Sequence, residues 1–315
     1  MRRLSFSLLI LLALVWGLDR AVGSCMQKLF LSSTSIEEGD VLRRAWDYRA
    51  PSVVCGSSRA THHYVVDSLG SILGVRAYNL GRDGSYGPVF MYGVSGIVTR
   101  HYTPKLWIMD VGSAIERGPV LTGRLSVFLP YVDSEPVARE VVGLRSKYES
   151  LRLWSRTYRY NSLILSLLAP RLGKPVHPRL GFLPLQGTYT SAPPAVLAEK
   201  MRVPVITPVP IDTLKLRYLR RTVDLMKSCG TTVIAVRSPR YLETPAEELY
   251  SRSEGIEMQQ LFGRLNVRVL DLTAIRIARF RDPRLFKDPA HMNETGALIF
   301  TRMLADSIRE LHLGS

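Results

Sequence analysis

Two short stretches far apart in the chain hold residues whose types and spacing suit nucleophilic catalysis. Ser58 follows a glycine and a serine at the end of a short apolar run, and Asp288 and His291 stand three positions apart near the C-terminus. A serine hydroxyl becomes a good nucleophile when a base accepts its proton, and histidine can do so near neutral pH. A carboxylate within the same turn can hold one ring nitrogen and leave the other for the serine. The spacing therefore predicts that His291 is the base for Ser58 and that Asp288 orients His291.

A glycine-rich turn lies between these stretches and suits the stabilisation of negative charge. Residues 79–84 read NLGRDG and follow another apolar run. Backbone amides in a tight turn can donate to the oxyanion that develops during acyl transfer, and glycine lets the backbone come close. Each stretch also has a structural alternative: a serine that caps a helix, a glycine turn, and a turn before a capped helix. Their combination and order favour catalysis over these alternatives.

The apolar patterns predict the elements that position these residues. Runs that are apolar on both faces are typical of parallel strands covered by helices, and they fall at residues 52–55, 75–79, 105–111, 231–237 and 267–272. Helical spacing follows at residues 60–73, 89–101, 213–229 and 254–265, and Asn293 with Glu294 marks the start of a last helix. This alternation predicts an α/β domain with a parallel sheet, whose ligand site lies at the carboxyl ends of the strands.

Taken together, these stretches resemble the SGNH hydrolases, also called GDSL-type esterases. The first is similar to the family's first block, with Ser58 in the place of the nucleophile and Ser57 in the place of the usual aspartate. Asp288 and His291 are similar to the last block. The resemblance covers about residues 53–113 and 231–311. It implies a three-layer α/β/α sandwich around a flavodoxin-like parallel sheet of five strands.

The second and third blocks of the family decide how the oxyanion would be held. Residues 79–84 are similar to the second block, which implies an oxyanion hole made by the amides of Ser58 and Gly84. The third block of the family carries an asparagine donor that this chain lacks after residues 105–111. Losing one such donor costs on the order of 100- to 1,000-fold in rate. Ser113 and Asn161 are candidates to replace it, and the alternative is that the scaffold is catalytically inactive.

Several further polar residues are candidates for binding substrate or for structure alone. Arg59 follows the nucleophile and could hold a substrate carboxylate, or it could be a surface arginine or form an internal salt bridge. Asn79 and Asn161 are further candidates for substrate binding. His62 and His63 are neighbours, so they would point in different directions on a helix, and we expect packing or surface roles rather than a metal pair. The sequence has no P-loop, zinc signature or dinucleotide fingerprint, so no cofactor is implied.

The charge of the chain predicts an anionic partner. The net charge is +15, and between Arg139 and Arg179 nine arginines and lysines stand against two glutamates. Within this stretch, LRLWSRTYRYNS interleaves three aromatic residues with arginines. It is either an amphipathic helix with a solvated basic face or a surface that binds an anionic glycan or the membrane. No nucleic-acid-binding motif is present, so nucleic acid is not an expected partner.

The N-terminus has the features of an export or anchoring signal. Two arginines precede the apolar residues 4–18, and Asp19 and Arg20 follow them. Fifteen residues are short for a membrane span of about 20, but the basic start and the apolar run favour an uncleaved signal anchor. The alternatives are a cleaved signal peptide, a lipoprotein with a lipid on Cys25, and a buried helix. Either of the first two, like an anchor, would place the rest of the chain outside the cytoplasm.

These patterns predict three regions and one function. Residues 1–24 form a single-pass transmembrane anchor, residues 25–50 a stalk, and residues 51–315 an SGNH-like domain with an insert at about 113–205. The resemblance extends to a membrane-anchored branch of the superfamily found in bacterial envelopes. It implies an esterase or O-acyltransferase that acts on an acylated envelope or exported glycan, alongside the polysaccharide machinery of the envelope. The alternative is an inactive scaffold that binds anionic glycan through the basic aromatic insert.

Overall fold

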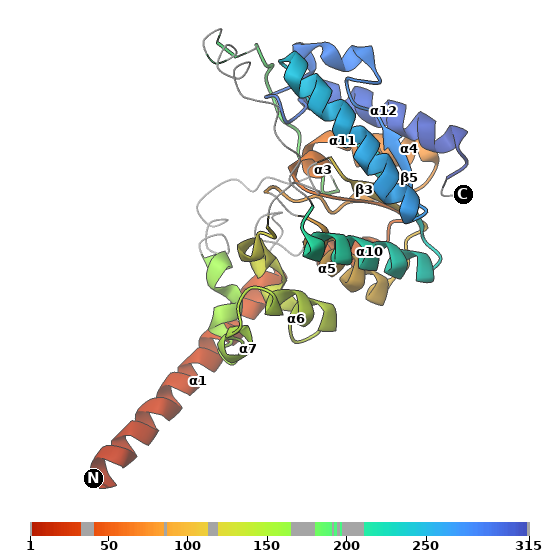
Figure 1. The fold of residues 1–315 in the computed structure, drawn as a ribbon. Helices are drawn as coiled ribbons and strands as arrows, with labels where there is room; N and C mark the ends of the chain where they lie inside the picture. The colour runs from red at the N-terminus through yellow and green to blue at the C-terminus, as the bar shows by residue number, and fades with distance from the viewer. Residues whose placement is uncertain are drawn as a thin grey trace. The chain divides into compact units, whose positions relative to one another are not determined.

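A computed structural model describes residues 2–32, 41–84, 87–112, 119–164, 180–190, 192–193, 196 and 211–313. The chain folds into two compact units, each of which joins segments that are distant in the sequence (Figure 1). The helical unit comprises Met1–Val41 and Thr122–His177, and the sheet unit comprises Leu42–Leu121 and Pro178–Ser315. The predicted insert at 113–205 is therefore divided between the two units.

The sheet unit is built on five parallel strands in the order β2-β1-β3-β4-β5. The strands are β1 (Ser52–Cys55), β2 (Ala77–Asn79), β3 (Leu106–Asp110), β4 (Thr232–Arg237) and β5 (Arg268–Asp271). β1 lies between β2 and β3, with Val54 opposite Asn79 on one side and Ile108 on the other. Every residue of these three strands is buried, which explains why their sequences are apolar on both faces. The predicted parallel α/β sheet is confirmed.

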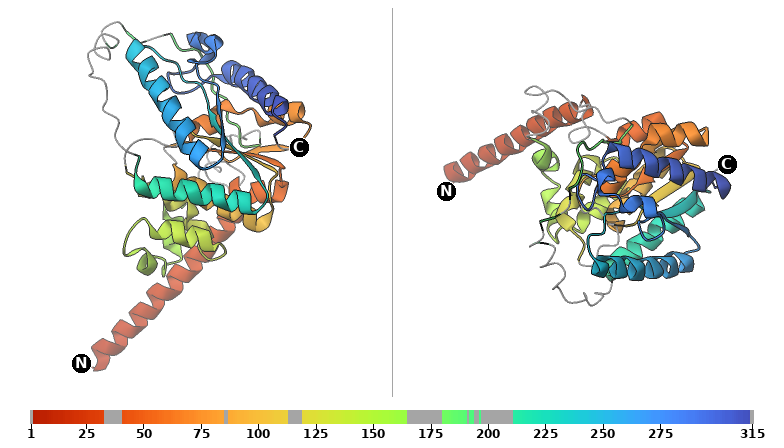
Figure 2. Two further views of the ribbon diagram at one scale, coloured as in Figure 1. Left: turned by 45° about the vertical axis from the view of Figure 1, so that its right-hand side comes forward. Right: turned by 90° about the horizontal axis from the view of Figure 1, so that it is seen from above.

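Helices cover both faces of the sheet. In Figure 1, α5 (Pro88–His101) and α10 (Thr213–Ser228) pack together below it, and α4 (Val66–Leu73) and α12 (Glu294–Glu310) pack together above it. α11 (Pro245–Arg264) runs beside β5, and Figure 2 shows the same layers from two further directions. The remaining elements of this unit are α2 (Val41–Tyr48), α3 (Ser58–His63), η4 (Ala278–Arg281) and η5 (Pro283–Leu285). The side chains of α4 and α12 that face the sheet join one buried apolar core with the strands.

Two predicted helices have different bounds in the structure. The helix predicted over residues 60–73 is divided into α3 and α4 by a break at Tyr64 and Val65. Thr301 of α12 accepts a hydrogen bond from the amide of Val65 at 2.9 Å and donates to the carbonyl of His63 at 3.1 Å. These bonds satisfy backbone groups that a continuous helix would pair by itself.

The other difference is at the start of α11. This helix begins at Pro245 rather than at the predicted residue 254, because Thr244 and Glu247 form a reciprocal capping box before its apolar pattern becomes clear. The predicted start of the last helix is confirmed, since the side chain of Asn293 accepts from the amide of Gly296 at 3.0 Å.

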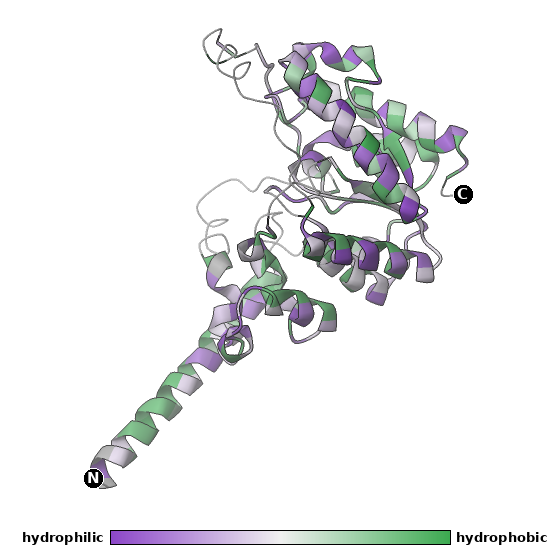
Figure 3. Ribbon diagram, in the orientation of Figure 1, coloured by the Kyte–Doolittle hydropathy of each residue, from purple (hydrophilic) through white to green (hydrophobic). Residues whose placement is uncertain are grey.

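The helical unit is assembled around one long helix, α1 (Arg2–Ser32). Residues 5–18 are exposed, and Figure 3 shows that this half of the helix is apolar. The segment Ser5–Ser32 has a mean hydropathy of 1.8 and is long and apolar enough to cross a membrane, a test that a signal sequence also passes. The other elements are η1 (Thr122–Tyr131), α6 (Pro136–Gly143), α7 (Glu149–Arg152) and η2 (Thr157–Leu163).

The second half of α1 is covered by η2. The carboxylate of Asp19 accepts from the hydroxyl of Ser155 at 2.5 Å and from the amides of Arg156 and Thr157 at 2.8 and 3.1 Å. A Cβ on Gly23 would lie 2.4 Å from the Cβ of Arg156, so glycine is needed for this close approach. Asp19, the first of the two charged residues that follow the apolar run, thus holds the start of η2 against α1.

The predicted stalk at 25–50 is helical at both ends. Residues 25–32 continue α1, where the ring of Phe30 packs edge-on against that of Tyr131, with centroids 5.7 Å apart. Residues 41–48 form α2 in the sheet unit, and residues 33–40 lie outside the described residues. At least its first third is therefore part of a folded unit.

Candidate active site

Ser58 is the first residue of α3 and lies three positions after Cys55, the last residue of β1. A Cβ at Gly56 would lie 2.8 Å from the Cβ of Ala60 and 3.0 Å from that of Asp110. Real Cβ atoms do not approach so closely, so the strand must end in glycine for α3 to start here. Ser57 stands where the SGNH pattern that the sequence resembles has an aspartate. It is the N-cap of α3 and is 1% exposed.

The structure brings Ser58, His291 and Asp288 together in one hydrogen-bonded chain. Nε2 of His291 lies 2.8 Å from Oγ of Ser58, and Nδ1 lies 3.0 Å from each carboxylate oxygen of Asp288. An ionised carboxylate can only accept, so Nδ1 carries the proton and Nε2 is left to accept from the hydroxyl. This is the geometry and the tautomer that a general base for a serine requires.

Asp288 is fixed by the turn that it begins. Its carboxylate also accepts from the amides of Ala290 and His291, at 2.8 and 2.9 Å. Burial alone would raise the pKa of Asp288, but the hydrogen bonds from His291 and from these amides outweigh it and hold the pKa below its ordinary value. The carboxylate therefore stays ionised at neutral pH and keeps the imidazole in one orientation.

The turn after β2 is clamped onto α3. The side chain of Asn79 is fully buried; its amide donates to the carbonyl of Ala60 at 2.6 Å, and its oxygen accepts from the amide of Gly81 at 2.8 Å. A Cβ on Gly81 would lie 2.4 Å from the backbone nitrogen of Thr61, so only glycine fits there. Asn79 thus braces the turn through backbone groups, and its side chain does not face solvent. Gly84 ends the turn with φ 108°, which favours glycine.

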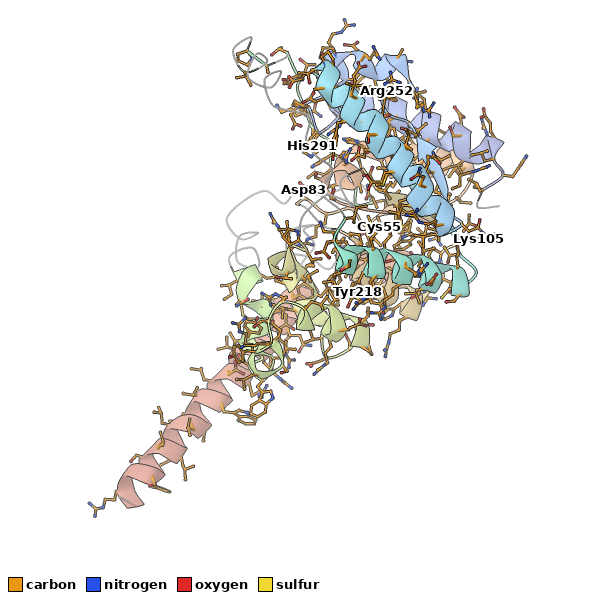
Figure 4. The ribbon with its side chains drawn as sticks, in the orientation of Figure 1. Cys55, Asp83, Lys105, Tyr218, Arg252 and His291 are labelled. Atoms are coloured by element: carbon orange, nitrogen blue, oxygen red, sulfur yellow. The ribbon has the colours of Figure 1, made fainter. Side chains whose placement is uncertain are left out.

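His62 joins this turn to the candidate catalytic residues. Its Nε2 lies 3.1 Å from the carboxylate of Asp83, and its Nδ1 lies 2.7 Å from the carbonyl of Leu183. Burial lowers the pKa of His62, but Asp83 and the carbonyl together raise it above its ordinary value. The rings of His62 and His291 meet edge to face with centroids 5.6 Å apart, and Figure 4 shows Asp83 and His291 at the same edge of the unit.

His63 fixes the residue that follows the candidate base. Its Nε2 accepts from the amide of Met292 at 3.0 Å, so the ring proton is on Nδ1. Burial, and then the nearby cation of Arg59, hold the pKa of His63 well below its ordinary value, so the ring is neutral. The two adjacent histidines therefore have packing and bracing roles, and each supports one side of the Ser58–His291 pair.

The carboxyl end of β3 holds a cation where the family pattern has an asparagine donor. Asp110 is fully buried and accepts from the phenol of Tyr64 at 2.8 Å. The side chain of Arg59 is 8% exposed, and a Cβ on Gly112 would lie 2.5 Å from its Nη2. The guanidinium therefore rests on the glycine that follows β3. The alternative that Arg59 is a surface residue is therefore wrong. Ser113 lies outside the described residues.

Asn161 belongs to the helical unit. It lies on η2, where it is exposed. It is not part of the group gathered around Ser58 within the described sheet unit.

Residues 180–190, from the predicted Pro/Gly-rich loop, line the same edge of the sheet unit. The carbonyl of Leu180 accepts from the amide of Asn79 at 2.9 Å, and the amide of Leu183 donates to the carbonyl of Thr61 at 3.1 Å. Further along, the carbonyl of Leu185 accepts from the amide of Glu294 at 2.9 Å. One segment thus ties together the turn after β2, helix α3 and the start of α12. Residues 173–179, 191 and 194 of that loop lie outside the described residues.

Comparison with known proteins gives no family for the chain: no family model matches the sequence, and no curated protein matches it. The described residues contain no group of three or more histidine, cysteine, aspartate or glutamate side chains placed to hold a metal ion.

Sequence reasoning missed the groups that support the triad-like chain. These are His62, His63 and the pairing of Arg59 with Gly112. A signal for the histidines was present, since SRATHH has polar residues at every position but Ala60, and the helix that it forms buries all of its residues but Ser58. Their partners at Leu183 and Met292 are 121 and 229 residues away, which no local pattern reveals.

Proposed function

We propose that this protein catalyses serine-dependent acyl transfer through a seryl ester on Ser58. The observation that carries the proposal is the continuous hydrogen-bonded chain from Asp288 through His291 to the hydroxyl of Ser58. These three hydrogen-bonded side chains lie at the carboxyl edge of a parallel sheet whose strand order is β2-β1-β3-β4-β5, and such folds bind ligands at this edge. Together with the sequence blocks, it supports membership of the SGNH superfamily and its three-layer fold.

The proposed reaction has two halves in which one proton moves between oxygen and His291. Ser58 Oγ attacks the carbonyl carbon of an ester while Nε2 takes the hydroxyl proton. The tetrahedral intermediate then collapses, the bond to the leaving alcohol breaks, and that alcohol takes the proton from Nε2. In the second half an acceptor hydroxyl gives its proton to Nε2 and attacks the seryl ester. Collapse of this intermediate releases the product and returns the proton to Ser58. Asp288 remains ionised throughout and stabilises the imidazolium.

The charge on the intermediate needs donors, and we assign three. The amide of Ser58 lies in the first turn of α3, where backbone N–H groups have no acceptor within the helix. The amide of Gly84 lies in the clamped turn after β2. The guanidinium of Arg59, held on Gly112, takes the place of the asparagine that the chain lacks. A cation can stabilise an oxyanion as well as a substrate carboxylate, so Arg59 serves either role.

The acceptor distinguishes an esterase from an O-acyltransferase. Water as acceptor gives hydrolysis, whereas a sugar hydroxyl gives transfer. The resemblance to envelope proteins favours an acylated envelope or exported glycan as substrate, close to the polysaccharide machinery that makes it. No cofactor takes part in this scheme.

We further propose that α1 is retained as a single-pass anchor, with both units outside the cytoplasm in the periplasm or at the cell surface. Cleavage before Cys25 would remove Asp19 and Gly23, which hold η2 on the helix. The helical unit would then lose a buried interface and leave the amides at the start of η2 without acceptors. This coupling supports an anchor over a cleaved signal peptide or a lipoprotein.

An acyl-enzyme experiment tests the reaction. The full-length protein in detergent is mixed with p-nitrophenyl acetate, quenched in acid and analysed by peptide mass spectrometry. We expect one acetyl group on Ser58 and none on Ser57, and no adduct in His291→Ala. Adding a soluble sugar acceptor should speed loss of the adduct if the protein is a transferase. An acetyl group spread over several serines, or unchanged in His291→Ala, would contradict the proposal.

A second candidate function is an inactive scaffold that binds anionic glycan, and the absent asparagine favours it. The basic aromatic segment supports it less than its sequence predicts, because Tyr160 is 4% exposed and the phenol of Tyr158 bonds to the carboxylate of Glu149. Of its three interleaved rings, only Trp154 is broadly exposed, at 75%. The segment is also not one amphipathic helix, since it forms α7 and η2.

A further inference from the structure

The helical unit has a basic cavity that includes Arg20 of α1, close to the end of the continuously exposed apolar stretch of that helix. The cavity has a volume of about 480 Å³ and is lined by Arg20, Arg139, Ser150, Leu153, Trp154 and Arg159. Arg20 comes from α1, two residues after Leu18, the end of the continuously exposed apolar stretch. The other lining residues come from α6, α7, η2 and the chain between them. Three separate segments thus bring three guanidinium groups to one cavity.

The cavity carries an excess of positive charge that the backbone holds in place. Arg139 and Arg159 share one carboxylate, that of Asp133, whose side chain is 55% exposed. Arg139 also donates to the carbonyl of Val132 at 3.2 Å, and Arg159 donates to that of Leu153 at 3.0 Å. These bonds fix both side chains before any ligand arrives, which lowers the entropic cost of binding an anion.

Arg20 adds a third charge from the helix itself. Its guanidinium lies over the ring of Trp16, 5.2 Å from the centroid. The neighbouring carboxylate of Asp19 accepts from Ser155, Arg156 and Thr157. Three guanidinium groups therefore line the cavity, and the partly exposed carboxylate of Asp133 pairs with two of them, Arg139 and Arg159. This excess of cations suits an oxyanion such as a phosphate.

The length of the apolar stretch places this cavity at a defined depth. Residues 4–18 span about 22 Å at the rise of an α-helix, whereas the hydrocarbon core of a bilayer is about 30 Å thick. At Asp19 the helix meets the start of η2, and beyond it one side of the helix is buried, as at Gly23, Met26 and Phe30. When an apolar span is shorter than the hydrocarbon core, the bilayer thins locally and the flanking polar side chains lie among the lipid headgroups. If α1 is an anchor, Arg20 and the cavity therefore lie at headgroup level.

Exposed aromatic and apolar side chains stand on, or next in sequence to, the elements that line the cavity, as is typical of a membrane interface. Trp154 is 75% exposed, and its neighbours on and before α7, Leu151 and Tyr148, are 61% and 56% exposed. Trp16 on α1 is 63% exposed. Tryptophan and tyrosine concentrate at the boundary between headgroups and hydrocarbon, with basic side chains reaching outward. Exposed apolar groups beside fixed cations fit a lipid better than a hydrated sugar chain.

We propose that this cavity binds the phosphate of an anionic phospholipid from the outer surface of the membrane that holds α1. The proposal rests on the anchor part of the proposed function and is independent of the chemistry at Ser58. The lipid would fix the helical unit against the membrane surface. It gives the basic insert a partner that the reaction itself does not require.

The test uses the full-length protein in nanodiscs made of phosphatidylcholine, with or without one fifth phosphatidylglycerol. After transfer to mild detergent, native mass spectrometry counts the phosphatidylglycerol molecules that stay bound. We expect one to be retained by the wild type. Arg20→Gln and Arg139→Gln should each lower retention about fivefold, because a basic residue near an anionic surface contributes about that factor. Both side chains are partly or largely exposed, so the variants should fold.

The matched control is Arg309→Gln, which removes one exposed charge from α12 of the sheet unit and should retain the lipid as the wild type does. Equal retention by the wild type and both cavity variants would overturn the proposal. Displacement of the lipid by glycerol phosphate alone would also overturn it, because a soluble phosphate would then be the occupant. A chain that fails to enter nanodiscs would refute the anchor as well, whereas acylation of Ser58 in detergent would be unaffected.

Discussion

Two pairs of arginines, one pair in each unit, differ in how they are buried and paired. In the sheet unit, Arg59 and Arg237 are buried, and Arg237 bonds to Asp271 at 2.7 Å and to Glu254 at 2.9 Å. In the helical unit, Arg139 and Arg152 are at least half exposed, and each pairs with a carboxylate that a second arginine shares. Buried and paired charge fixes positions to a fraction of an ångström, as catalysis requires. Exposed charge in excess attracts a large anionic partner. The difference is consistent with the proposals that the sheet unit carries the chemistry and the helical unit binds an anionic partner.

We expect the largest loss of activity from a substitution of Asp288 in the sheet unit. Asp288→Asn removes the charge that holds the tautomer and stabilises the imidazolium of His291. We expect kcat/KM for p-nitrophenyl acetate to fall by about 100- to 10,000-fold, with an unchanged unfolding temperature. Asp306→Asn, an exposed carboxylate on α12, is the control and should keep full activity. Comparable activity in the two variants would remove Asp288 from the mechanism.

The next effect tests whether Arg59 replaces the missing asparagine. Arg59→Met should lower kcat/KM about 100-fold, the usual effect of losing one donor to an oxyanion. Gly112→Ala should act in the same direction, since its Cβ would lie 2.5 Å from Nη2 of Arg59 and displace the guanidinium. Gly123→Ala in the helical unit has nothing within 4 Å of its Cβ and should leave the rate unchanged. Full activity in Arg59→Met would require another donor.

A smaller effect should be confined to the helical unit. Asp19→Ala removes the acceptor for three groups at the start of η2, and we expect it to destabilise this unit by about 2 kcal/mol. Hydrogen exchange of amides in residues 122–163 should accelerate, while esterase activity and exchange in β1–β4 stay constant. An equal loss of activity would mean that the two regions do not divide binding from chemistry.

The smallest expected effect is a pH dependence that arises from His62. The pKa of His62 is raised in the folded protein, so the stability that its protonated ring gains from Asp83 is present below its ordinary pKa. That contribution is lost as the pH rises through the raised value. Urea unfolding should therefore show a small loss of stability as the pH rises above the ordinary histidine pKa of about 6.5. His62→Gln should remove this slope, and an unchanged slope would assign it to another group.

Much of the sheet unit is predictable from sequence because its signals are local. The strands are continuous apolar runs, and the helices between them have apolar faces with the period of a helix. The approach of Ser58 to His291 was predicted from residue types at strand ends, because the carboxyl ends of parallel strands meet at one edge. The break at Tyr64 was not, since its compensating bonds come from Thr301, more than 200 residues away.

The helical unit was not predictable for the same physical reason. Its fold depends on Asp19 and Gly23 meeting Ser155 and Arg156, across about 130 residues of chain. Its short 3₁₀ segments have no lasting periodicity, and the basic aromatic pattern predicts a surface without saying which rings are buried. Tyr160 is one of the rings that would stack on a ligand under the binding alternative, but its ring packs against that of Phe30 of α1, with centroids 6.1 Å apart. Local patterns thus reveal the sheet unit better than the helical unit.

The most direct test of the central claim is labelling with a fluorophosphonate, which reacts with activated serines. The full-length protein in detergent is labelled, digested and mapped by mass spectrometry, alongside Ser58→Ala and His291→Ala. The account predicts label on Ser58 in the wild type and none in either variant, each shown to be folded by its unfolding temperature. Folded wild-type protein that takes no label, or a label that persists in His291→Ala, would contradict an activated serine and leave the basic helical unit as the seat of function.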